Sequence, residues 1–68
     1  MVNVNEIKVQ MIRKKMTAQD VYTRLGISKK MWYDRMSKGR FNSDEMYALI
    51  KILDIDDPSA IFFAENVT

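Results

Sequence analysis

Three residues interrupt the helical pattern of this chain: Gly26, Gly39 and Pro58, its only glycines and its only proline. Glycine readily takes positive φ values and proline has no amide donor, so both types mark the ends and starts of helices. Between these residues, apolar side chains recur at spacings of three and four, and no alternating stretch is long enough to predict a strand. The sequence therefore predicts an all-α fold.

Residues 17–38 contain two predicted helices, over 18–25 and 29–38, which meet at Gly26. The glycine suits a tight turn between them, and Ser28 offers a hydroxyl oxygen that can cap the second helix. A helix, a short turn with glycine and a capped second helix form the outline of a helix-turn-helix. We expect this motif to be the centre of the fold.

Three further helices are predicted over 4–15, 43–53 and 58–63. Their starts, and that of the helix at 18–25, carry residues that commonly cap helices. These are Asn3 or Asn5, Thr17, the Asn42-x-x-Glu45 capping box, and Asp56-Asp57 followed by Pro58 as first helical residue.

Helical spacing also predicts which side chains are buried. The expected core residues are Val4, Ile7, Met11, Met16, Ala18, Val21, Tyr22, Leu25, Ile27, Trp32, Met36, Phe41, Met46, Leu49, Ile50, Leu53 and Ile61. Trp32 is also of a type that stacks on ligands, but its i,i+4 spacing to Met36 favours the core.

A chain of 68 residues is one domain at most, and residues 64–68 are expected to form a frayed tail. Because it has neither cysteine nor histidine, a disulfide, a Cys/His zinc site and catalysis by either residue are excluded. Asp54, Asp56 and Asp57 crowd one turn, where helix capping explains them better than a cation site. We expect no enzymatic activity and no cofactor.

The sequence gives no sign of a membrane protein. No segment approaches 18 continuous apolar residues, and the N-terminus lacks the basic-then-apolar order of a signal peptide. We therefore expect no membrane partner and a cytoplasmic location, which the lack of thiols also fits.

Charge divides the chain into two unequal parts. Residues 13–40 carry nine lysines and arginines against two aspartates, a net charge of +7, whereas residues 41–68 carry one lysine against six acids, a net charge of −5. A basic segment that coincides with a helix-turn-helix is the pattern expected of a phosphate-binding surface. Solvated lysines on a small helical protein are the alternative interpretation.

A helix-turn-helix inserts its second helix into the major groove of double-stranded DNA, with the N-terminal residues of that helix nearest the bases. Lys29 and Lys30 occupy those positions, and Tyr33 follows one turn later. Residues near helix N-termini and past the end of the reading helix suit the phosphate backbone. The candidate DNA contacts are therefore Thr17, Gln19, Ser28, Lys29, Lys30, Tyr33, Ser37, Lys38 and Arg40.

Some of these residues have simpler roles open to them. Tyr33 can pack on a neighbour or on a dimer partner, and Gln19 can be merely exposed. Arg35, beside the core stripe, is expected to pair with Asp34 or Asp20 instead of DNA.

The sequence resembles the Cro/repressor-type (XRE) helix-turn-helix family of phage and bacterial regulators. The resemblance covers about residues 7–63 and rests on Thr17, Val21, Leu25-Gly26-Ile27-Ser28, Trp32, Met36 and Gly39. It implies a compact five-helix, lambda repressor-like domain with the motif on helices two and three. It further implies a sequence-specific transcriptional repressor or switch of phage or prophage origin, which binds DNA as a homodimer in a bacterial host cell.

The chain departs from that family at three positions. Tyr22 stands where many members have alanine, Ala18 where glutamine often opens the second helix, and Trp32 where a branched aliphatic residue is usual. Some relatives bind another phage regulator rather than DNA, so an antirepressor on the same fold is the alternative. The apolar run 61–63 is the surface expected to meet such a partner or a second copy.

Overall fold

The computed structural model describes residues 2–62, and within that range the chain is helical without any strand. Four helices have 8 to 10 residues, and the fifth element is a single turn of four. They are α1 (Val4–Arg13), α2 (Ala18–Leu25), α3 (Lys29–Lys38), α4 (Ser43–Ile52) and α5 (Ser59–Phe62). The all-α prediction is confirmed, but the fifth helix expected over 58–63 is reduced to one turn that begins after Pro58.

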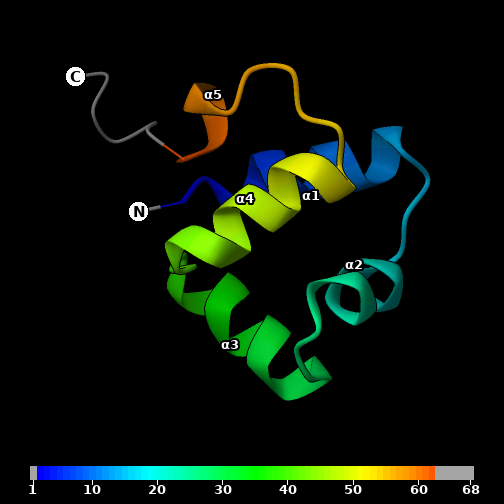
Figure 1. The fold of residues 1–68 in the computed structure, drawn as a ribbon, viewed down its shortest axis with the longest axis vertical. Coiled ribbons are helices and arrows are strands. Elements are labelled where there is room, and N and C mark those ends of the chain that lie inside the picture. The colour runs from blue at the N-terminus through cyan, green and yellow to red at the C-terminus, as the bar shows by residue number, and fades with distance from the viewer. Residues whose placement is uncertain (1, 63–68) are drawn as a thin grey trace.

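Figure 1 shows how these elements are arranged. The helices α2 and α3 lie together at one end of the molecule, α4 and α1 lie across its middle, and α5 lies at the other end. Helix α2 packs against both α3 and α4, and α1 packs against α5. The helices α2 and α3 therefore share one end, opposite to the end that holds α5.

The predicted helix starts carry the predicted caps. Asn3, rather than Asn5, accepts a hydrogen bond from the amide of Glu6 at 3.2 Å. Thr17 begins α2 in a reciprocal capping box with Asp20. The Asn42 and Glu45 side chains form the expected box at the start of α4. Each cap satisfies amide groups that a helix start leaves without partners.

All four longer helices end in the same way. Gly26, Gly39, Lys15 and Asp54 each take a positive φ, of 78°, 65°, 56° and 48°. In each case the amide of the following residue donates to the carbonyl five positions back, from residues 16, 27, 40 and 55 to residues 11, 22, 35 and 50. This is the Schellman pattern, which closes the last turn of a helix. It explains why α1 and α4 stop earlier than the predicted Lys15 and Leu53.

One continuous core lies between the helices. Its buried apolar residues are Val2, Ile7, Val21, Trp32, Phe41, Leu49, Leu53, Ile55 and Ile61. The Trp32 and Phe41 rings meet at a centroid distance of 5.9 Å and an interplanar angle of 57°, a tilted contact that aromatic pairs favour. Both rings were expected in the core, whereas Val2 and Ile55 were not.

Residues 2 and 3 tie the two ends of the fold together. The Val2 amide donates to the carbonyl of Gly39 at 2.9 Å, and the Asn3 amide donates to that of Ile61 at 2.8 Å. The N-terminal segment thus lies between the end of α3 and α5.

None of the helices in the described range is long and apolar enough to cross a membrane.

Candidate nucleic-acid interface

Helix α3 turns one face into the core and leaves the other exposed. Trp32 has only 1% of its surface exposed, whereas Tyr33, the next residue, has 52%. Lys29, Lys30 and Ser37 are exposed with it. The structure therefore places four of the candidate DNA contacts, Lys29, Lys30, Tyr33 and Ser37, on the surface of one helix.

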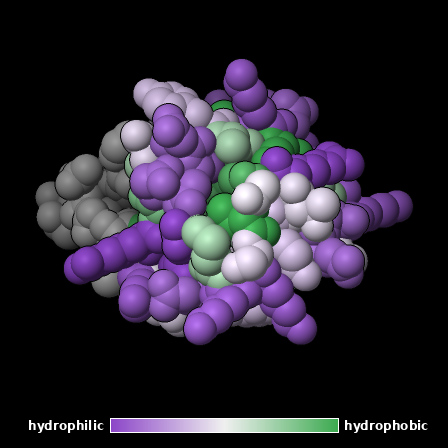
Figure 2. All heavy atoms as spheres, turned by 60° about the horizontal axis from the view of Figure 1, so that its bottom comes forward, coloured by the Kyte–Doolittle hydropathy of each residue, from purple (hydrophilic) through white to green (hydrophobic). Residues whose placement is uncertain are grey.

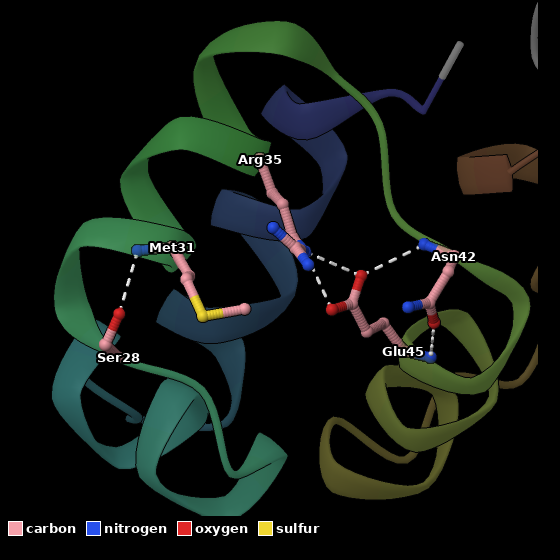
Figure 3. Close-up of polar contacts among 5 residues, drawn as sticks. All are labelled: Ser28, Met31, Arg35, Asn42 and Glu45. Atoms are coloured by element: carbon pink, nitrogen blue, oxygen red, sulfur yellow. Dashed lines mark hydrogen bonds and ion pairs between the residues drawn. The ribbon is translucent and has the colours of Figure 1, made fainter.

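An ion pair between α3 and α4 fixes the position of α3 (Figure 3). The Arg35 Nε donates to both carboxylate oxygens of Glu45, at 2.8 and 2.7 Å. The Glu45 Oε1 also accepts from the Asn42 amide at 3.0 Å, and the Glu45 amide donates to the Asn42 Oδ1 at 2.8 Å. One carboxylate therefore caps the start of α4 and holds the flank of α3.

This pair corrects the sequence prediction for Arg35. We expected Asp34 or Asp20 as its partner, but the partner is Glu45, at the start of α4. Asp34 instead pairs with Lys38, and Asp20 is committed to the Thr17 cap. The Arg35–Glu45 contact depends on the angle between α3 and α4, which helical spacing along one segment cannot reveal.

The environment shifts the ionisation of this pair. Burial raises the pKa of Glu45. The hydrogen bonds from the Arg35 side chain and the Asn42 amide lower it by more than burial raises it, so the pKa lies below its ordinary value. The hydrogen bond to Glu45 raises the pKa of Arg35. Glu45 therefore stays ionised although only 8% of its surface is exposed.

The two hydroxyl residues at helix starts are used as caps. The Ser28 Oγ accepts from the Met31 amide at 3.1 Å (Figure 3), and the Thr17 Oγ1 accepts from the Asp20 amide at 3.1 Å. The backbone hydrogen bond from Thr17 to Asp20 lowers the pKa of that aspartate. Each hydroxyl keeps its own O–H for donation to a phosphate. Gln19 is exposed beside them on α2.

Two candidates near the end of α3 have partners within the helix. The Lys38 Nζ lies 3.2 Å from the Asp34 carboxylate, one turn earlier, and the Ser37 Oγ donates to the Asp34 carbonyl at 2.9 Å. Arg40 is exposed just after Gly39, and its amide closes the end of α3 on the Arg35 carbonyl. Of these three, only Arg40 has a charged group without an ion pair among the described residues.

A groove of about 410 Å³ runs along one side of α3, and we call it the α1–α3 groove. Helix α1 contributes Lys8 and Met11, α2 contributes Ala18, and α3 contributes Trp32, Tyr33, Met36 and Ser37. Figure 2, which brings the α2–α3 end of the molecule forward, shows apolar residues gathered at the centre of the view and hydrophilic side chains around them. Sequence reasoning missed Lys8, because it lies outside the basic segment 13–40.

The acidic turn after α4 does not form a metal site in the described residues. Asp54, Asp56 and Asp57 border a smaller groove of about 270 Å³, which Arg13 and Lys14 also line. Lys14 lies 3.9 Å from Asp54, and the Asp57 carboxylate accepts from the amide and hydroxyl of Ser59. No group of three acidic side chains within residues 2–62 is placed to hold a metal ion.

The prediction that residues 61–63 form a contact surface is wrong in part. Ile61 has only 1% of its surface exposed, so it belongs to the core and cannot serve as a contact residue. The Phe62 side chain, Phe63 and the tail at 64–68 lie outside what the structure describes. The exposed large apolar side chains lie elsewhere in the described range: Val9, Ile12, Met31, Tyr33 and Tyr47.

Comparisons of this chain with protein-family models, with curated proteins and with solved structures find no match.

Proposed function

We propose that this protein is a sequence-specific DNA-binding transcriptional regulator of the repressor or switch type, of phage or prophage origin. In this proposal α2 and α3 form a helix-turn-helix of the Cro/repressor (XRE) type, in a lambda repressor-like domain. The observation that carries the proposal is the exposed face of α3. Lys29, Lys30 and Tyr33 project from a helix that a partly buried ion pair helps to hold in place.

The size and charge of α3 suit the major groove. An α-helix with its side chains is about 10–12 Å across, and the major groove of B-DNA is about 12 Å wide. Lys29 and Lys30 form the first turn of α3, from which ammonium groups can donate to guanine O6 and N7. Tyr33 lies one turn later, where its hydroxyl can reach a base edge or a phosphate and its ring a thymine methyl.

The remaining candidates suit the backbone on either side. Thr17, Gln19 and Ser28 lie at or beside the starts of α2 and α3, where helix dipoles favour phosphate. Lys38 and Arg40 lie at the other end of α3. Because such contacts carry no base information, they set affinity and register, while the first turn of α3 sets sequence preference.

The oligomeric state belongs to the same proposal. Regulators of this kind read two half-sites about one helical turn apart, so we expect a symmetric homodimer on a two-fold operator in a bacterial cytoplasm. Ile61 is buried, so the second copy has to use other residues.

A second candidate function is an interaction module that binds another regulator, as an antirepressor does. The observation that favours it is the exposure of large apolar side chains away from α3. Ile12 on α1 has 77% of its surface exposed and Tyr47 on α4 has 69%. If this is the function, Ile12→Ser or Tyr47→Ser abolishes binding to the partner regulator, and the protein binds no DNA even at low salt.

The test is a titration of labelled duplex DNA from the operator region at several salt concentrations. For a DNA-binding regulator, the logarithm of the binding constant falls linearly with the logarithm of the salt concentration, with a slope of about −0.9 per phosphate contact. Lack of binding at 50 mM salt, or binding that does not depend on salt, would disprove the proposal. Bovine serum albumin at the same concentration controls for adsorption of the probe.

A further inference from the structure

We infer that the α1–α3 groove seats the sugar–phosphate backbone of one DNA strand, and that Lys8 on its rim is a phosphate contact. The inference rests on the proposed function, because it concerns how the same duplex is held. It adds a residue of α1, a helix to which no DNA contact has been assigned so far.

The groove and the exposed face of α3 share a wall. Tyr33 and Ser37 belong to the face proposed to enter the major groove, and both also line the α1–α3 groove. A helix about 10–12 Å across nearly fills a groove about 12 Å wide. The two strand backbones therefore pass along the flanks of α3, and one flank is this groove.

The groove combines apolar and cationic side chains, which suit a sugar–phosphate chain. The floor of the groove consists of apolar side chains, among them Met11, Ala18 and Trp32, and a cationic side chain stands at its rim. A sugar–phosphate chain offers the complementary groups, since the carbon-bound hydrogens of deoxyribose can pack on an apolar floor while phosphate meets an ammonium group. A free inorganic anion would find one cationic partner here and would leave the apolar floor uncovered.

Lys8 supplies the positive charge at the rim of the groove. It is exposed, and it makes no ion pair with any residue in the range 2–62, whereas Lys14 and Lys38 each lie within 4.0 Å of an aspartate. A lysine engaged in an ion pair must break that contact to bind phosphate. Lys8 has no such contact to lose among the described residues, so its charge is available to DNA.

The test uses the full chain and two substitutions, each with a matched control. Lys8→Gln removes the charge and leaves the groove open, and Lys51→Gln removes an exposed charge from α4. Ala18→Met fills the groove and keeps Lys8, and Thr23→Met adds the same side chain at an exposed position of α2. Fluorescence anisotropy with labelled duplexes of several sequences, from 50 to 200 mM salt, gives affinity and salt slope.

We expect Lys8→Gln to reduce the salt slope by about 0.9 and to weaken binding at 50 mM salt at least about threefold on every duplex. Ala18→Met should weaken binding on every duplex as well, while both control variants stay within about twofold of the wild type. Circular dichroism shows whether each variant is folded. If Ala18→Met does not fold, the slope of Lys8→Gln decides alone.

Two results would overturn the inference, and they differ in meaning. If the wild type binds DNA in a salt-dependent way and Lys8→Gln keeps its slope and affinity, the groove is not the backbone seat, although the proposed function stands. An apolar peptide side chain is then its better occupant. If the wild type binds no duplex at all, the proposed function and this inference both fail.

Discussion

The Nε of Arg35 donates to both carboxylate oxygens of Glu45, and this contact joins α3 to α4. The two residues lie ten positions apart, on either side of the Gly39 turn. Because Glu45 also accepts from the Asn42 amide, the same carboxylate orders the turn that separates the two helices. The orientation of the exposed α3 face therefore depends on this side chain of α4 as well as on the burial of Trp32 in the core.

Removal of that carboxylate should destabilise the protein. We expect Glu45→Ala to lower the free energy of unfolding by about 1.5–3 kcal/mol, because it breaks charge-assisted hydrogen bonds and leaves a partly buried arginine without its partner. Urea unfolding followed by circular dichroism measures the change. Asp44→Ala, at the exposed neighbouring position, should cost less than about 1 kcal/mol through the helix dipole. Equal losses in both variants would contradict the account.

Stability should fall in acid for the same reason. The pKa values of Glu45 and Asp20 are lower in the folded protein than their ordinary values of about 4.3 and 3.9, so the unfolded chain takes up protons first. Their contribution is thus complete above about pH 5 and is lost as the pH falls through the folded-state values.

Urea titrations at pH 7, 5, 4 and 3 measure this dependence. The wild type should lose more stability between pH 5 and pH 3 than the double variant Asp20→Asn/Glu45→Gln, which cannot ionise at these positions. A wild type as stable at pH 3 as at pH 7 would be incompatible with the hydrogen bonds of these two carboxylates.

The helix ends give a third prediction. Lys15 takes a φ of 56° at the end of α1, a conformation that strains side chains with a Cβ, so Lys15→Gly should stabilise the protein by about 0.5–1 kcal/mol. Gly26→Ala should destabilise it by about 1–2 kcal/mol through backbone strain alone, because a Cβ at that position would meet no atom within 4 Å. Thermal unfolding measures both changes in stability. Changes of the opposite sign would contradict the positive φ values at Lys15 and Gly26.

These helix ends also show what the sequence could and could not predict. Gly26 and Gly39 were recognised as helix ends because glycine favours positive φ, and both take it. Lys15 and Asp54 adopt the same conformation, but lysine rarely does so and aspartate only occasionally, so the predicted helices there were too long. The signal lies in the hydrogen bond to the carbonyl five positions back, which only a folded helix possesses.

The candidate site, too, could be predicted from the sequence only in part. Helical periodicity was enough to separate Trp32 in the core from Tyr33 on the surface, because both belong to one helix. It could not find the partner of Arg35 or the position of Lys8 beside α3, since both depend on how separate helices pack. Burial along one helix was accessible from sequence, whereas contacts between helices required the fold. The Asp34–Lys38 pair within α3 was also missed, because Asp34 had been assigned to Arg35.

A fourth prediction separates base contacts from backbone contacts. Lys30→Ala should relax base preference, at a cost of about 1–3 kcal/mol on the preferred sequence, whereas Lys38→Ala should weaken all sequences about equally. The Lys38 effect should be small, because Asp34 already pairs with this lysine. Competition binding with single-base variants of one duplex measures both. If the two substitutions act alike, the division of roles along α3 is wrong.

The central claim, that the exposed face of α3 reads DNA sequence, is tested most directly by selection from a library of random duplexes. We expect enrichment of sites with two similar half-sites about 10–10.5 base pairs apart, and binding to the enriched sites at least about 10³-fold tighter than to random DNA. Lys30→Ala should weaken that enrichment. If the wild type retains duplexes without enriching any sequence, or retains none, α3 is not a sequence-reading helix.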